Sequence, residues 1–148
     1  MRPLHLATLI LLALSFVPAT AAHAAPVRLT PEQRAAAATF AEGKVGAPYR
    51  WGAIGPRAFD CSGLVTFAYR AARAPLNVRT TSQLWNVGAH VQRAALQRGD
   101  IVWVWDARRG HVGMYLGAGR YVHAPSPGRR VTIAALPSAS HYFGAVRP

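Results

Sequence analysis

The order of two hydrophobic patterns along the chain constrains the fold more than any other feature of the sequence. Apolar residues recur at helical spacing only before Asp100. Short runs rich in β-branched and aromatic residues follow, separated by glycine, proline or charge; they cover residues 101–105, 112–116, 121–123, 131–133 and 142–146. Helices first and strands afterwards predict an α+β domain, with N-terminal helices packed on a C-terminal antiparallel β-sheet.

Three segments carry helix-start signals, each a polar N-cap residue followed by a helix-forming stretch. The predicted helices run from Thr30 towards residue 44, from Asp60 to the residues before Pro75, and from Thr80 to near Gly88. Cys61 therefore lies in the first turn of the second helix.

The first 24 residues predict an export signal. Arg2 gives a positive start, residues 6–17 form an apolar run, and Ala22 to Ala24 offer a small-x-small cleavage site. The apolar run is shorter than the roughly 20 residues needed to span a bilayer, so a membrane anchor is the less favoured interpretation. Cleavage after Ala24 would leave residues 25–148, a length that predicts one domain in an exported protein, either periplasmic or secreted.

Charge and cysteine content narrow the classes of function. Seventeen Lys and Arg stand against five Asp and Glu, a formal net charge of +12. No nucleic-acid-reading motif accompanies the scattered arginines, so we expect no nucleic-acid partner; an anionic cell envelope or an arginine-rich solvated surface fits the charge instead. The chain indicates no obligate protein partner. The only cysteine, Cys61, has no partner for an intramolecular disulfide and indicates a reactive thiol in an exported protein.

Cys61 stands where a thiol can become a nucleophile. First-turn amides of a helix have no intrahelical partner, so they can stabilise a thiolate and receive the oxyanion of a tetrahedral intermediate. A buried structural cysteine is the alternative interpretation. His111 and His123 lie on two successive β-runs joined by a turn at residues 117–119, which can place both rings on one face. A nucleophile, a base and a group that orients the base follow the logic of a catalytic triad.

Six short segments carry a recognisable pattern. They are residues 46–52 (GAPYRWG), 59–65 (FDCSGLV), 79–82 (RTTS), 96–102 (LQRGDIV), 111–117 (HVGMYLG) and 122–125 (VHAP). In this order they resemble the NlpC family of bacterial cell-wall cysteine peptidases, whose fold is a compact relative of papain. The resemblance spans about residues 45–133 and implies hydrolysis of peptidoglycan stem peptides between D-glutamate and diaminopimelate, through a thioester.

The resemblance also implies a role for each matching residue. Cys61 would be the nucleophile, His111 the general base, and His123 the residue that orients His111. Tyr49 would support the oxyanion beside the Cys61 amide. The substrate-binding positions would be Asp60, Ser62 and Ser82. Asp60 has a second interpretation as a helix cap alone, and no cofactor or metal is implied.

Three other functions stay open for the same residues. An amidase that removes whole stem peptides, or an acyltransferase, would use the same thiol. Cys61, His111 and His123 are chemically able to hold zinc with one open position, although their spacing matches no metal motif. A non-catalytic wall-binding protein would need only the basic charge.

Overall fold

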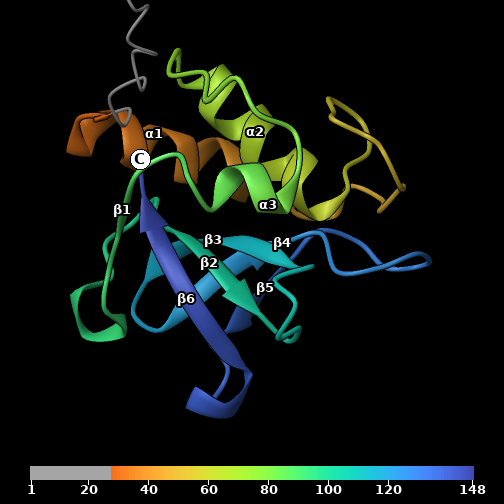
Figure 1. The fold of residues 1–148 in the computed structure, drawn as a ribbon. Helices are drawn as coiled ribbons and strands as arrows, with labels where there is room; N and C mark the ends of the chain where they lie inside the picture. The colour runs from red at the N-terminus through yellow and green to blue at the C-terminus, as the bar shows by residue number, and fades with distance from the viewer. Residues whose placement is uncertain (1–27) are drawn as a thin grey trace, which may run out of the picture.

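In the computed structural model, which describes residues 28–148, three helices precede most of a six-stranded sheet (Figure 1). The helices are α1 (Pro31–Glu42), α2 (Cys61–Ala71) and α3 (Thr81–Leu84), with two 3₁₀ turns, η1 (Arg93–Ala95) and η2 (Ala139–His141). The strands are β1 (Ala89–His90), β2 (Ile101–Val104), β3 (Val112–Gly117), β4 (Arg120–His123), β5 (Thr132–Ala135) and β6 (Tyr142–Arg147). The predicted export signal, residues 1–24, lies outside the described residues. Within them, no helix is long and apolar enough to cross a membrane.

Every strand pairing in the sheet is antiparallel, and the strand order is β1-β6-β2-β3-β4-β5. Strand β3 ends at Gly117 and β4 begins at Arg120, so the turn predicted at residues 117–119 lies at this connection. Gly117 and Gly119 have φ angles of 97° and 69° there, a left-handed conformation that glycine adopts at little cost. The predicted α+β class with an antiparallel sheet is confirmed.

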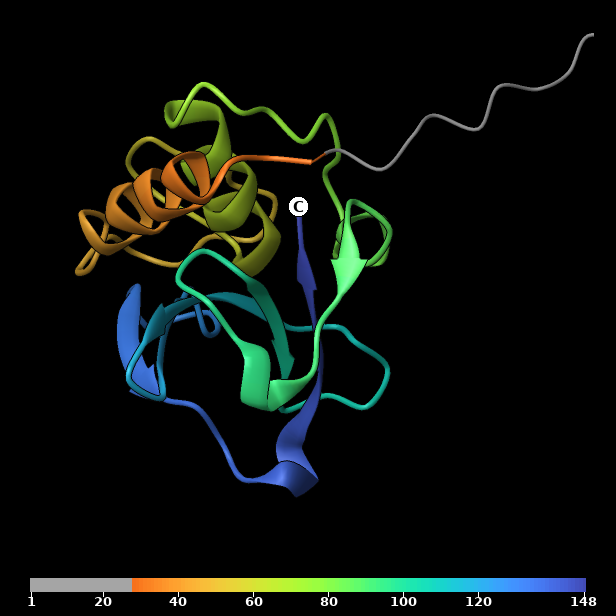
Figure 2. The ribbon, with the colours of Figure 1, turned by 90° about the vertical axis from the view of Figure 1, so that its left-hand side faces the viewer.

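The main core lies between the helices and one face of the sheet, an arrangement that both ribbon views show (Figures 1 and 2). Strand β2 explains how the two faces separate. Its residues Ile101 and Trp103 join the core under the helices, whereas Val102 and Val104 belong to a smaller cluster that includes Tyr121. All five are fully buried. Alternate side chains of a strand point to opposite faces, so one short apolar run supplies both clusters.

The helix starts follow the predicted capping signals, but the third helix is shorter than predicted. Thr80 caps α3 with a capping box to Gln83, and the helix ends at Leu84 rather than near Gly88. A Cβ on Gly88 would lie 2.1 Å from the Arg147 backbone oxygen. The chain therefore leaves the helix early because it must run against the end of β6.

Two features of the sheet differ from the sequence prediction. Strand β1 was not predicted, because a two-residue exposed strand has no hydrophobic pattern and exists only through its pairing with β6. Strand β5 begins at Thr132 rather than at Val131. The amide of Val131 instead donates to the Ala47 oxygen at 2.8 Å, and its own oxygen accepts from Gly46 at 2.9 Å. Val131 thus joins the sheet to the loop before α2.

Candidate active site

Helix α2 begins at Cys61 because Asp60 caps it. The Gly63 amide donates to Asp60 Oδ1 at 2.7 Å, and the Asp60 amide donates to the Ala53 oxygen at 2.9 Å. These bonds fix the first turn against the preceding loop. The amides of Cys61 and Ser62 in that turn act on a half-buried thiol.

The two histidines meet across the β3–β4 hairpin. His111 immediately precedes β3, His123 ends β4, and His111 Nε2 lies 2.8 Å from His123 Nδ1. Their rings are edge-to-face, with centroids 5.1 Å apart. A Cβ on Gly113 would lie 2.6 Å from the Tyr121 ring and 3.1 Å from His123 Cβ, so only glycine leaves the space that this approach needs. The predicted juxtaposition of the two rings is confirmed.

The thiol of Cys61 lies at the junction of α2 and β3. Its sulfur is 3.8 Å from the Gly110 oxygen, on the residue next to His111. Burial raises the pKa of the thiol above its ordinary value, and backbone N–H groups of Val112, Ser62 and Cys61 partly oppose this rise. His111 uses Nε2 towards His123, so Nδ1 is the ring nitrogen left for the thiol.

Burial also sets the protonation of both imidazoles. The pKa of His111 falls from 6.5 to about 4, mainly through desolvation, with Asp106 opposing the fall. The pKa of His123 falls to about 4 through desolvation and then through the positive charges of His111 and Arg129. At neutral pH the pair is therefore uncharged, and the resting site combines a protonated thiol with a neutral base.

The lowered histidine pKa values predict a loss of stability in acid. Between pH 6.5 and 4, His111 and His123 bind more protons in the unfolded chain than in the folded chain. The stability that the neutral rings contribute is therefore present above pH 6.5 and is lost as pH falls through this window. Thermal unfolding measured from pH 7 to 4 should follow this trend. A His123→Gln variant should show a shallower slope; an unchanged slope would contradict the assignment.

The thiol opens into a cleft of about 300 Å³ between the loop before α2, the first turn of α3 and Gly110. The lining residues are Tyr49, Trp51, Gly52, Asp60, Cys61, Ser62, Arg79, Thr80, Thr81 and Gly110. The structure thus brings Tyr49, Asp60 and Ser62 to the thiol, as predicted from the family resemblance. Ser82 is exposed and is not among the lining residues.

A comparison with known protein families gives a match over most of the chain. The model of the NlpC/P60 family matches residues 46–147. The chain belongs to the NlpC/P60 family. Its papain-like fold is shared with solved NlpC/P60 domains such as NlpC2 from Trichomonas vaginalis, with a TM-score of 0.69, 31% identity, and coverage of 78% of this chain and 46% of that chain.

Two curated relatives of this NlpC/P60 chain carry the names of hydrolytic enzymes. Murein DD-endopeptidase MepH of Escherichia coli (strain K12) is 37% identical over 113 residues, covering 70% of this chain and 42% of that protein. Gamma-DL-glutamyl hydrolase of Bacillus subtilis (strain 168) is 37% identical over 100 residues, covering 65% of this chain and 24% of that protein. The chain thus spans less than half the length of these curated relatives.

Arg79 is a residue of the NlpC/P60 cleft to which sequence reasoning assigned no role. Its guanidinium forms an ion pair with Asp60, and its Nη1 donates to Ser62 Oγ at 2.7 Å. Asp60 also accepts from the Gly52 amide at 3.0 Å. The available signal was the scarcity of acids, because a buried carboxylate in so basic a chain must find an arginine.

Asp60 has no spare acceptor capacity in this NlpC/P60 cleft. Its carboxylate takes five donors, from Gly52, Ser62, Gly63 and two nitrogens of Arg79. Only 6% of the residue is exposed. This geometry favours the capping interpretation of Asp60 over direct capture of a substrate amine.

Loss of the Arg79 ion pair should destabilise the domain. Arg79→Gln leaves a nearly buried carboxylate with weaker compensation, and we expect the free energy of unfolding to fall by about 1–2 kcal/mol, discounted because the arginine is partly exposed. Denaturant unfolding measures the change. Arg57→Gln, at an exposed position, is the matched control and should change it little. Equal effects from both variants would contradict a specific role for the pair.

Tyr49 lies half-buried against the thiol, and its pKa is raised by burial and by the neighbouring Cys61 and Asp60. Its hydroxyl therefore remains a proton donor at neutral pH. Trp51 beside it is 85% exposed.

Within residues 28–148, no three His, Cys, Asp or Glu side chains gather in a way that could hold a metal ion.

Proposed function

We propose that this chain is a cysteine endopeptidase that hydrolyses peptide bonds in peptidoglycan stem peptides. One observation carries the proposal: the thiol of Cys61 lies at a helix N-terminus in the cleft of an NlpC/P60 domain, 3.8 Å from the Gly110 oxygen, and the next residue, His111, pairs with His123. The names of MepH, a murein DD-endopeptidase, and of the Bacillus subtilis glutamyl hydrolase support it.

Each catalytic step has a candidate group among Cys61, His111 and Tyr49. His111 accepts the thiol proton as the sulfur attacks the peptide carbonyl, forming a C–S bond. The Cys61 amide and the Tyr49 hydroxyl donate to the oxyanion. His111 then protonates the leaving amine as the C–N bond breaks, and in the second half it takes a proton from the water that hydrolyses the thioester.

His123 holds His111 in the reactive orientation. The 2.8 Å contact occupies His111 Nε2, which leaves Nδ1 as the ring nitrogen that can accept the thiol proton. Both rings are neutral at pH 7 because of their burial, so the base is available without prior deprotonation. Attack therefore depends on proton transfer from a thiol that burial keeps protonated.

Our first candidate for the cleaved bond is D-glutamyl to diaminopimelate, from the family resemblance and in line with the name of the Bacillus subtilis relative. The second candidate is a bond between two D-centres, as the name of MepH indicates. Mass spectrometry of purified peptidoglycan digested with the protein distinguishes them by the length of the released peptides. Cys61→Ala is the blank for that digest.

The same digest tests the alternatives. An amidase would release intact stem peptides, an acyltransferase would need an added amine, and a non-catalytic wall-binding protein would sediment with the wall without cleaving it. Release of no fragment by a freshly reduced protein would overturn the endopeptidase proposal. The substrate is part of the envelope, so the proposal includes export through a signal at residues 1–24 to the periplasm or the medium.

A further inference from the structure

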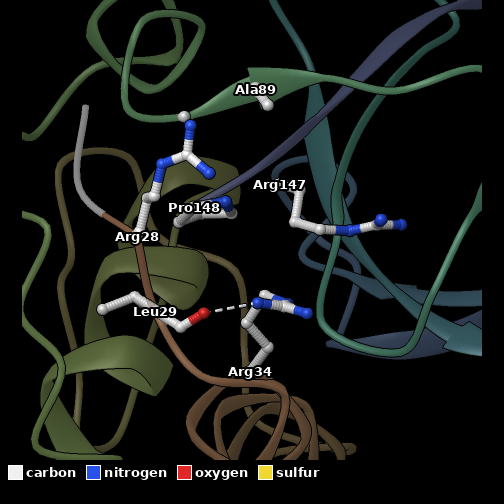
Figure 3. A pocket seen from close by; sticks show the side chains of 7 residues that line it. Arg28, Leu29, Arg34, Ala89, Arg147 and Pro148 are labelled. Atoms are coloured by element: carbon white, nitrogen blue, oxygen red, sulfur yellow. Dashed lines mark hydrogen bonds between the residues drawn. The ribbon is translucent and has the colours of Figure 1, made fainter.

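A second cavity lies between the start of α1, strand β1 and the end of β6 (Figure 3). Its volume is about 320 Å³. Three arginines line it, Arg28, Arg34 and Arg147, together with Leu29, Ala89 and Pro148. None of these residues lines the cleft that contains Cys61, so the cavity is a separate feature of the molecule.

The three arginines differ in how their charge is compensated. Arg147 is neutralised by the buried carboxylate of Asp100, with Nε–Oδ1 and Nη2–Oδ2 distances of 2.8 and 2.7 Å. Arg34 has only neutral partners: it donates to the Leu29 oxygen at 2.5 Å and to Gln97 Oε1 at 3.3 Å. Among residues 28–148, no carboxylate forms an ion pair with Arg34 or Arg28, and Glu32 attracts Arg34 only at longer range.

Arg34 also has an unused donor. The residue is only 6% exposed, and its buried Nε has no hydrogen-bond partner in the described part of the chain. A buried charge without a counter-charge costs free energy, and an anion bound in the cavity would supply that counter-charge. Arg28 is exposed, lines the same cavity and adds a second positive charge without an ion pair among the described residues.

We propose that this cavity is an anion site that binds a phosphate group. A guanidinium presents parallel donors that match the oxygens of phosphate, and two uncompensated arginines favour a group that carries up to two negative charges. The volume admits a phosphate with a small substituent, so the group could belong to a free phosphate or to a lipid headgroup. The site is independent of the proposed peptidase reaction.

Phosphate titration of the purified protein tests the site directly. The Nε–H resonance of Arg34 should shift saturably with inorganic phosphate, and not with sodium chloride at the same ionic strength. Arg28→Gln should weaken the affinity by about tenfold or more, since it removes a charged hydrogen-bond donor at an exposed position that folding does not need. Arg34→Gln should abolish the binding.

The matched control is Arg120→Gln, an equal loss of charge at an exposed position on β4. It should change phosphate affinity by less than about twofold. Vesicles of phosphatidylglycerol, compared with vesicles of phosphatidylcholine, separate the two sources. Vesicle binding that is lost in Arg28→Gln but kept in Arg120→Gln assigns the site to a lipid headgroup. Binding of inorganic phosphate without binding of vesicles assigns it to free phosphate. Equal behaviour of these two variants in both assays would overturn the site. Arg28→Gln should leave wall hydrolysis unchanged, so a failure of the anion site and a failure of the peptidase proposal can be told apart.

Discussion

Replacing Cys61 with alanine should lower kcat/KM on stem peptides by roughly 10⁴-fold or more, with the fold intact. The variant keeps the cleft, the two imidazoles and the first-turn amides, but nothing else in the cleft is a nucleophile of comparable strength. His111 would have to activate water directly, at a position that the sulfur normally occupies. Steady-state hydrolysis of a synthetic stem peptide measures the loss.

The control for this prediction is the stability of the variant. Cys61 is half-buried, and the hydrogen bond of its thiol to the Gly110 oxygen is long, at 3.8 Å. Thermal unfolding of Cys61→Ala should therefore stay close to that of the unmodified protein. Substantial hydrolysis by a well-folded Cys61→Ala variant would contradict nucleophilic catalysis by this residue.

Replacing Gly63 with alanine should reduce both stability and activity. A Cβ at this position would lie 2.1 Å from the Ala53 oxygen and 2.9 Å from Asp60 Oδ1, so either the loop or the helix start must move. We expect the free energy of unfolding to fall by about 3 kcal/mol, as for other overpacked backbone contacts. Activity should fall as well, because the displaced turn carries Cys61.

Gly43 offers a matched control for this substitution. It caps the C-terminus of α1 with a φ of −63°, and a Cβ there would meet its nearest backbone atoms at 3.5 and 3.6 Å, which are ordinary contact distances. Gly43→Ala should therefore change denaturant unfolding by less than about 1 kcal/mol. A similar loss in both variants would show that the Ala53 contact is not the cause.

Local signals account for what the sequence predicts correctly. Thr30, Asp60 and Thr80 each cap a helix through bonds to residues three positions away, so short-range chemistry is sufficient to locate the helix starts. The meeting of His111 and His123 follows from one hairpin with a short turn. The thiol, its helix and the imidazole pair are therefore all visible in short stretches of sequence.

Features that depend on distant pairing were not predictable in the same way. Strand β1 exists because it pairs with β6, more than fifty residues later. The Arg79–Asp60 pair joins the start of α2 to the segment before α3; the scarcity of acids indicates that Asp60 needs an arginine, but no spacing specifies which one. The arginine-lined cavity likewise needs the start of α1 and the end of β6 to meet.

The division of the site between two halves of the chain has a consequence for its activation. The thiol belongs to α2, on the helical layer, whereas both imidazoles belong to the β3–β4 hairpin. Neither layer alone contains a nucleophile together with its base. On the proposed function, peptide hydrolysis requires the helices to dock on the sheet, and a chain that has not reached this step lacks the assembled pair of nucleophile and base.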